Sequence, residues 1–335
     1  QRPGSVGVSA ADRRLGAWRM PTGPNLSVGC PSLGDMTTEL TPRVDEPVPA
    51  ATLAGPLAGA VPDVGDPFAG LTRTNSLSPS RASDFMSCPL LYRFRVIDRL
   101  PETPSVDAVR GSVVHKVLEG LFDLPATDRT HARANSLLGP VWDDLLRDEP
   151  ELAEMFGADT TDLATWLDQC RDLLGRYFLL EDPQRLEPAE REAHVATRLE
   201  SGLTLHGYID RVDVAPSGDL RIVDYKTGRS PSVYFEAKAL FQMKFYALVV
   251  WRTRGVIPRM LQLVYLGNGE MLRYEPEERD LLATERKLEA LWKAIQRAHS
   301  TGEWRPNPSA LCGWCDHQAL CPAFGGTPPP LPPPQ

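Results

Sequence analysis

The chain is 335 residues long and 42% hydrophobic, which is enough for one decorated domain or two typical ones. No apolar run approaches the roughly 18–20 residues of a membrane span, and the N-terminus lacks the basic-then-apolar order of a secretory signal, so we expect a cytoplasmic protein that does not enter membranes. The net charge of -8 argues mildly against nucleic-acid binding, but residues 193–260 carry a net positive charge while residues 119–192 are strongly acidic.

The first ordered element is expected near Ser78. Residues 1–74 are rich in Gly, Pro, Ala and Ser and have no helical or strand period, which predicts a disordered arm. Ser78 and Pro79 suit the N-cap and the first position of a helix, so a helix should begin there and run through Phe94. A second helix is predicted over 106–122, and residues 130–181 should form two or three more, within a helical insertion at about 123–186.

The hydrophobic period changes after this insertion. Three antiparallel strands are predicted at 193–199, 203–214 and 220–225, with a turn at Pro216-Ser217-Gly218. A helix at about 233–251, strands at 260–266 and 271–274, and a long helix at 276–299 follow. This order predicts an α/β fold with a helical insertion before the sheet. Residues 325–335 form a proline-rich tail that cannot pack as a helix or a central strand.

Asp224, Tyr225 and Lys226 end the third strand and give the strongest indication of chemistry. Residues i and i+2 of a strand share a face, so Asp224 and Lys226 should project side by side. Asp210 lies on the preceding strand of the predicted hairpin. Two carboxylates that share a hard cation, beside an ammonium that can steer a water, are the minimum set for metal-assisted phosphodiester cleavage. Alone, an Asp-x-Lys tripeptide is more often a solvated ion pair.

Four further side chains could belong to this site. His115 lies among apolar neighbours in the second helix, where a lone His is more often packed than ligating, but a helix before the sheet could bring its imidazole to the cation. Gln242 and Tyr246 are four residues apart, so they share a helix face that is either solvated or closes over the site. Glu192 lies at the start of the first strand. A charged residue there is usually exposed to solvent, and the alternative is a supporting role near the metal.

Cysteine forms the second motif. Cys312, Cys315 and Cys321 are clustered, and Cys88 lies far upstream next to Pro89. Three clustered thiolates need a fourth ligand, and either zinc or a [4Fe–4S] cluster would accept Cys88, while His317 is a competing ligand that would favour zinc. Disulfides are not expected in a large cytosolic chain. The remaining cysteines, Cys30 and Cys170, are expected to be bystanders.

From about Ser76 to Phe324 the chain resembles the RecB-type exonucleases of the PD-(D/E)xK superfamily. It is most similar to the branch that includes the AddB nuclease module and the CRISPR-adaptation exonucleases. The resemblance rests on six ordered motifs: Leu77-Ser78-Pro79-Ser80 with Cys88-Pro89 and Tyr92, Gly111-Ser112 with His115, Gly207 to Asp213, Val223 to Gly228, Gln242 with Tyr246, and the four cysteines. It implies a nuclease domain over residues 75–324 with a central mixed sheet flanked by helices.

The resemblance also implies the role of each residue. Asp210 and Asp224 would bind Mg²⁺ or Mn²⁺, with His115 and the backbone carbonyl of Tyr225 as further ligands. Lys226 would position or activate the attacking water, and Gln242 and Tyr246 would contact DNA or order the site. The four cysteines would hold a [4Fe–4S] cluster, with zinc as the alternative.

The expected activity is that of a metal-dependent DNA exonuclease that acts on single-stranded DNA or DNA ends in repair or recombination. The sequence has no G-x4-G-K-[ST] motif, so we expect the protein either to act on ready-made single strands and ends or to borrow a helicase partner. The competing hypothesis is a non-catalytic DNA-binding or scaffold protein that retains the nuclease fold.

Overall fold

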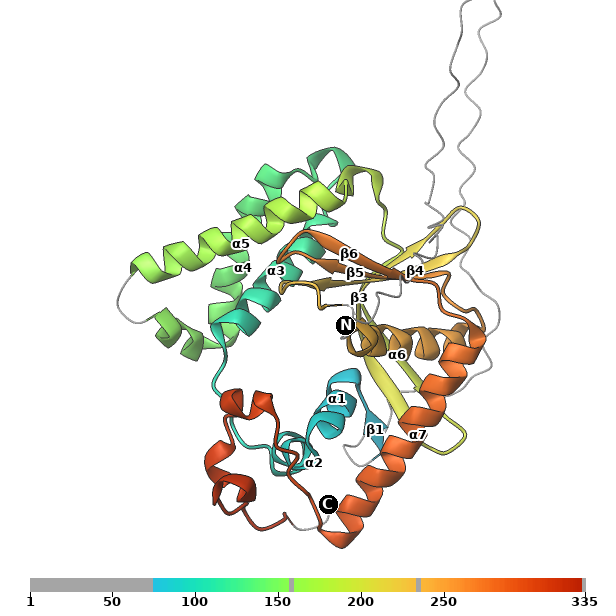
Figure 1. Ribbon diagram of the computed structural model, residues 1–335. Helices are drawn as coiled ribbons and strands as arrows, with labels where there is room; N and C mark the ends of the chain where they lie inside the picture. The colour runs from blue at the N-terminus through green and yellow to red at the C-terminus, as the bar shows by residue number, and fades with distance from the viewer. Residues whose placement is uncertain (1–74, 157–159, 233–235, 333–335) are drawn as a thin grey trace, which may run out of the picture. The chain divides into compact units, whose positions relative to one another are not determined.

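A computed structural model of the chain describes residues 75–332, apart from 157–159 and 233–235 (Figure 1). The predicted disordered arm, residues 1–74, lies outside the described residues. Within them, six strands form one mixed sheet: β1 (Ser76–Leu77), β2 (Glu190–Arg198), β3 (Thr204–Val214), β4 (Leu220–Lys226), β5 (Met260–Tyr265) and β6 (Glu270–Tyr274). The order is β1-β3-β4-β5-β6, with β2 also paired to β3. The expected α/β fold with a mixed sheet is confirmed.

The pairing of β3 leaves an interruption in the sheet. β1 forms a parallel pair with Thr204 and Leu205 of β3, and β4 forms an antiparallel pair with residues 211–214 of β3. Because β2 pairs with the same residues of β3, β1 and β4 must both occupy the edge of β3 opposite to β2. Within the described chain, no strand pairs with that edge from His206 to Asp210. We call this stretch of β3 the β3 gap.

Eight helices frame the sheet in the described residues, and their starts follow from local chemistry. They are α1 (Pro79–Ser87), α2 (Pro89–Tyr92), a π-helical turn (Arg93–Asp98), α3 (Val106–Leu121), α4 (His131–Asp148), α5 (Thr160–Leu180), α6 (Glu236–Arg254) and α7 (Glu278–Thr301). The Ser78 hydroxyl accepts the Arg81 N–H at 3.3 Å, which confirms the predicted N-cap of α1. None of the described helices is apolar over a stretch long enough to cross a membrane.

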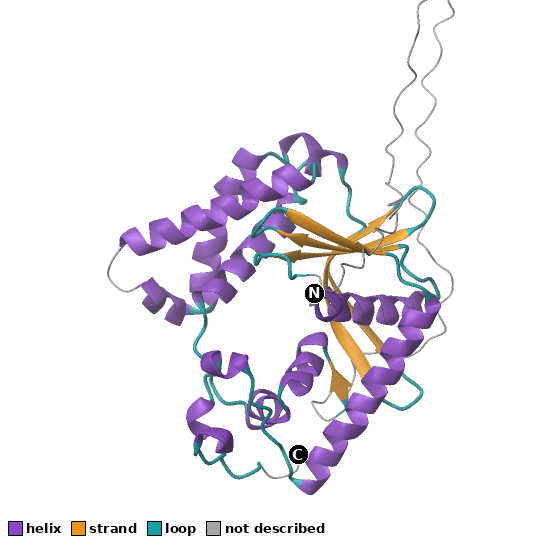
Figure 2. Ribbon diagram, in the orientation of Figure 1, coloured by secondary structure: helices purple, strands orange, loops and turns teal. Residues whose placement is uncertain are grey.

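The two faces of the sheet are buried by different helices (Figure 2). Alternation along β4 sends Ile222 into a core shared with α6 and α7, and sends Val223 into a second core shared with α3, α4 and α5. The predicted helical insertion therefore covers one face of the sheet. Asp224 and Lys226 alternate with Val223 and Tyr225, so these catalytic candidates lie on the α6 side of the sheet at the end of β4.

A buried ion cluster joins the insertion to the sheet. Arg211 of β3 is 1% exposed, and its guanidinium contacts Glu181, which follows α5, at 2.7 Å and Asp213 at 3.0 Å. It also donates a hydrogen bond to the Tyr225 hydroxyl. Burial raises the pKa of Glu181, but the positive charge of Arg211 outweighs that effect and holds the pKa below its ordinary value. Glu181 is therefore ionised in the folded protein at neutral pH.

The C-terminal segment folds back on the first helices. Short 3₁₀ turns at Ala310–Trp314, Gln318–Leu320 and Pro322–Phe324 carry the cysteine cluster. The described part of the proline-rich tail, 325–332, is also in contact with the domain: the Arg93 guanidinium donates a hydrogen bond to the carbonyl of Pro329. Arg93 belongs to the π-helical turn, so the tail contacts the N-terminal part of the domain.

Candidate active site

Asp210 sits where β3 and β4 begin to diverge. The ladder between these strands ends at the pair Arg211 and Val223. Beyond it, the Asp210 carboxylate accepts the backbone N–H of Tyr225 at 2.7 Å, in place of a backbone carbonyl. This bond places Asp210 against the strand that carries Asp224 and Lys226, as predicted from the hairpin.

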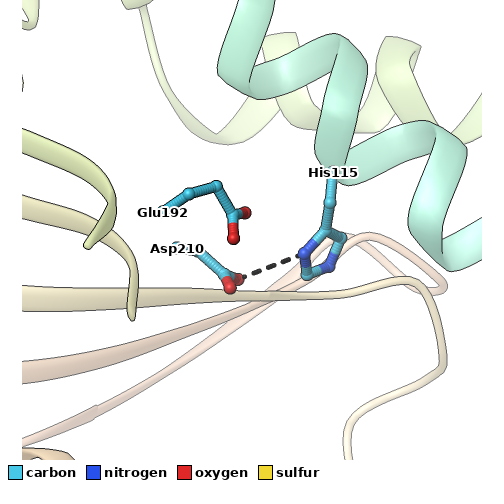
Figure 3. Close-up of side chains that lie close together, drawn as sticks. All are labelled: His115, Glu192 and Asp210. Carbon is cyan, nitrogen blue, oxygen red and sulfur yellow. Dashed lines mark ion pairs between the residues drawn. The ribbon is translucent and has the colours of Figure 1, made fainter. Parts of the chain in front are cut away.

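His115 reaches this point from α3. Its Nδ1 lies 3.5 Å from Asp210 Oδ2 (Figure 3). Its Nε2 lies 3.0 Å from the carbonyl oxygen of Tyr225. Burial lowers the pKa of His115, but the hydrogen bond to Asp210 and the nearby carboxylates raise it more, so the pKa lies above its ordinary value. The imidazole thus links the two strands that bear the acidic residues.

Glu192 joins the same group. One ligand atom from each of His115, Glu192 and Asp210 lies within 4.8 Å of the others, which is close enough for all three to bind a single metal ion (Figure 3). Glu192 has a φ of 43°, a left-handed backbone that non-glycine residues seldom adopt. Burial and the charge of Asp210 raise the pKa of its carboxyl group. The sequence left Glu192 as an exposed residue or a support near the metal; the structure places its carboxylate beside His115 and Asp210, and its role stays a prediction.

Asp224 and Lys226 project together toward α6. The Lys226 ammonium lies 2.6 Å from Asp224 Oδ2 and donates a hydrogen bond to Gln242 Oε1 at 3.0 Å. Gln242 in turn donates to Asp224 Oδ1 at 3.0 Å and contacts the Tyr246 hydroxyl at 3.2 Å. The i and i+2 spacing on β4 and the i and i+4 spacing on α6 thus bring these four side chains together.

The buried carboxyl group of Asp224 is electrostatically unusual. It is 2% exposed, and burial raises its pKa to about 6, an effect that Lys226 opposes and Asp210 reinforces. Its Oδ2 has no partner in hydrogen-bond geometry, although the Lys226 ammonium is near. Asp224 is not one of the three residues whose ligand atoms lie within 4.8 Å, and the Tyr225 carbonyl is bonded to His115. The ligand set expected from the sequence stays a prediction.

Comparison with known proteins places this geometry in a family. A model of the PD-(D/E)XK nuclease superfamily matches residues 76–322. The chain belongs to this superfamily. The match spans the sheet, the helical insertion and the cysteine-bearing segment, and it supports nuclease chemistry. The finer placement among RecB-type exonucleases stays a prediction.

Relatives of this PD-(D/E)XK protein include two mycobacteriophage proteins. The Gene 69 protein of Mycobacterium phage L5 is 29% identical over 126 residues, which cover 37% of this chain and 41% of the phage protein. The Gene 69 protein of Mycobacterium phage D29 is 25% identical over 280 residues, covering 74% and 96%. A crystal structure of a "Putative exonuclease" from Eubacterium rectale has a TM-score of 0.52 and 17% identity, and covers 73% of this chain and 88% of its own. At this identity it supports the shared fold.

The four predicted cluster ligands of this PD-(D/E)XK protein lie around one cavity. Its walls include Cys88, between α1 and α2, and Cys312, Cys315 and Cys321 of the C-terminal turns. Backbone N–H groups of Asn307 and Ser309 point at two of the sulfurs, Cys88 at 3.4 Å and Cys312 at 3.3 Å. The competing ligand His317 has its Nε2 3.0 Å from Glu102. Cys88 therefore lines the same cavity as the three clustered cysteines, whereas His317 is not among the residues that line it.

A second cavity opens beside the β3 gap, lined by Gln242, Tyr246 and residues for which the sequence predicted no role in the site. The latter include His206 and Tyr208 of β3 and the residues at the start of α1. His206 and Tyr208 alternate along β3, and this alternation is the one local signal that would have marked them. Their position beside a cavity depends on the long-range pairing of β1 and β4, which no local pattern encodes.

Proposed function

We propose that this chain is a metal-dependent deoxyribonuclease, an exonuclease that hydrolyses phosphodiester bonds in single-stranded DNA or at DNA ends. The observation that carries the proposal is the convergence of two carboxylates and one ammonium on adjacent strands, Asp210 on β3 and Asp224 with Lys226 on β4. Membership of the PD-(D/E)XK nuclease superfamily supports the same chemistry.

The side chains present fit a hard divalent cation. Asp210, Glu192 and His115 offer ligand atoms within 4.8 Å of one another, and Asp224 adds a buried carboxylate whose Oδ2 lies 2.6 Å from the Lys226 ammonium. Carboxylate oxygens are the ligands that Mg²⁺ and Mn²⁺ prefer. When bound, such an ion would polarise the scissile phosphate and lower the pKa of a bound water. We assign the ion to Asp210 and Asp224, with His115, Glu192 and the Tyr225 carbonyl around it.

The remaining side chains orient the reactants. Lys226 would hold the attacking water near Asp224, and its hydrogen bond to Gln242 restricts where the ammonium can point. Gln242 also fixes one oxygen of Asp224, while Tyr246 contacts Gln242 from the next helical turn. His115 holds the Tyr225 carbonyl. These contacts would preorganise the site before substrate arrives.

The cysteine cavity supports a [4Fe–4S] cluster over zinc. A tetrahedral zinc site holds its sulfurs about 3.8 Å apart, as its Zn–S bond of about 2.3 Å requires. No three of the four cysteines belong to a group of ligand atoms within 4.8 Å in the described part of the chain. A cluster of four irons holds its thiolates further apart than a single ion does. Cysteine ligands that line a common cavity at wider spacing fit the larger group.

The cellular role follows the same proposal. The strands it acts on would be already unpaired, or unwound by a partner helicase. We propose that it serves DNA repair or recombination. The competing scaffold hypothesis predicts DNA binding without cleavage, so one assay separates the two.

The decisive experiment is cleavage of 5′- and 3′-labelled single strands with Mg²⁺, with Mn²⁺ and with EDTA. We expect metal-dependent release of nucleotides from linear DNA, and no cleavage of closed circles. Asp210→Asn, Asp224→Asn and Lys226→Ala should each lower the rate by at least about 100-fold, since each removes charge stabilisation worth several kcal/mol. Asp219→Asn is the matched control, because Asp219 is an exposed carboxylate in the β3–β4 turn.

Two results would overturn the assignment. Full activity of Asp224→Asn or Lys226→Ala would remove these residues from the reaction. A wild-type protein that binds the strand and leaves it intact with either metal would favour the scaffold hypothesis.

A further inference from the structure

The cavity beside the β3 gap has the size of a ligand pocket. Its volume is about 450 Å³, within the range of about 300–1,000 Å³ that is typical of ligand pockets. The walls are β3 from His206 to Tyr208, the first turn of α1 with Arg81, and Gln242 and Tyr246 of α6. The cavity thus lies where β3 has no neighbouring strand and where α6 is reachable through the sheet.

An aromatic platform stands at this cavity. Tyr208 is 56% exposed, which is unusual for a large ring in the middle of a long strand. Its ring stacks on His194, its cross-strand partner on β2, with centroids 4.5 Å apart and planes inclined by 12°. His194 is exposed as well. The stack holds Tyr208 in one orientation, so that little side-chain freedom remains to be lost when a ligand binds.

The cavity adjoins the candidate active site. Tyr208 precedes Asp210 by two residues on β3, a separation of about 6.8 Å along an antiparallel strand. Gln242 and Tyr246 line the cavity, and Gln242 is bonded to both Asp224 and Lys226. A nucleotide base in this cavity would therefore be adjacent, along the substrate strand, to a phosphate that lies at Asp210.

We propose that this cavity binds an unpaired DNA base next to the scissile phosphate, stacked on Tyr208, and that it selects single strands over duplex. The inference rests on the proposed nuclease function. Aromatic rings bind unpaired bases of any sequence because every base has a π-face, and Arg81 adds a positive charge for the adjacent backbone. A base in a duplex is stacked and paired, so it cannot enter without being unpaired first.

The test is equilibrium binding of a fluorescent single strand in EDTA, where cleavage is blocked. Tyr208→Ala should weaken binding by about 10-fold to 100-fold, the loss expected for one base–aromatic stack. Tyr208→Phe keeps the ring and should bind like the wild type. Val214→Ala, at an exposed apolar position near the end of the same strand, controls for general effects on β3. Duplex binding should be unchanged in all variants.

A strand with one abasic position makes the test specific. Scanning the abasic position along the strand should reveal one site where wild-type binding weakens and Tyr208→Ala binding does not. Equal penalties in both proteins at every position, or wild-type affinity of Tyr208→Ala, would overturn the proposal. Failure of the nuclease hypothesis would look different, because Tyr208-dependent binding would persist in a protein that does not cleave with Mg²⁺ or Mn²⁺.

Discussion

Asp224 is held in surroundings that favour its neutral form when no metal is present. Burial raises its pKa to about 6, above the ordinary value of 3.8 that applies to the unfolded chain. A group whose pKa is raised on folding contributes stability that is fully present below the unfolded pKa and is lost as the pH rises through the folded pKa. The ionised carboxylate therefore destabilises the metal-free fold above about pH 6, by on the order of 3 kcal/mol.

Asp224→Asn should accordingly raise the melting temperature of the metal-free protein at pH 8, because the amide carries no charge to bury. The gain should shrink as the pH falls from about 6 toward 4, where the wild-type carboxyl becomes neutral too. Thermal melts in EDTA at pH 8 and pH 4.5 measure both effects. Addition of Mg²⁺ should stabilise the wild type more than the variant, which keeps only Asp210, Glu192 and His115 for the ion. A lower melting temperature of the variant in EDTA at pH 8 would contradict this view of Asp224.

At the scale of elements, the contact between α5 and the sheet depends on a buried ion pair. Arg211 and Glu181 have side chains 1% and 7% exposed, and a second bond joins Arg211 Nη2 to Glu181 Oε1 at 2.9 Å. Breaking one partner of such a pair leaves the other charge without full compensation. The helical insertion would then lose its main polar link to β3.

Glu181→Gln should lower the free energy of unfolding by roughly 3–5 kcal/mol at pH 7. Because the pKa of Glu181 is held below its ordinary value of 4.5, its contribution is fully present above that value. The contribution is lost as the pH falls through the lowered pKa, so the difference should diminish in acid. Urea denaturation at two pH values measures this. Asp168→Asn, which breaks an exposed pair with Arg171, should change stability by less than about 1 kcal/mol. Equal effects of the two substitutions would argue against the buried pair.

The predicted order of long elements was right because each carries its own local signal, such as the N-cap at Ser78 or the alternation that separates Ile222 from Val223. β1 was missed, since two residues are too short to show a period. The π-helical turn at Arg93–Asp98 was not predicted, because a single π-helical turn has no local pattern that distinguishes it from the end of an α-helix. In the site, the i and i+2 spacing predicted the pairing of Asp224 with Lys226. The proximity of Glu192 to His115 depends on a left-handed residue and a distant helix, which no short pattern contains.

Across the whole molecule, the cysteine cavity joins the two ends of the described chain. Cys88 follows α1, whereas the other three candidate ligands come from the last turns before the tail. A shared metal cluster would close a loop through almost the entire domain. Such a closure lowers the conformational entropy of the unfolded chain, so its loss would destabilise the folded state. The cluster would therefore stabilise the fold without taking part in phosphodiester chemistry.

Cys88→Ser should reduce the iron and sulfide content of the purified protein and make the C-terminal segment sensitive to limited proteolysis. Iron analysis, visible absorbance and mapping of the proteolytic fragments test this. Cys170→Ala is the matched control, because Cys170 is buried in the second core and burial raises the pKa of its thiol to about 12, which keeps it from acting as a thiolate ligand. A colourless wild-type protein with stoichiometric zinc would exclude the iron–sulfur assignment.

The backbone of Glu192 has a practical consequence for engineering. A left-handed non-glycine residue costs on the order of 1–3 kcal/mol, so a search for heat-tolerant variants would readily select glycine or asparagine at this position. Such a replacement would relax the chain and delete an acidic group that faces His115 and Asp210. Position 192 should therefore be kept as Glu in any library selected for thermal stability. Otherwise the selected variants would gain stability and lose catalytic rate.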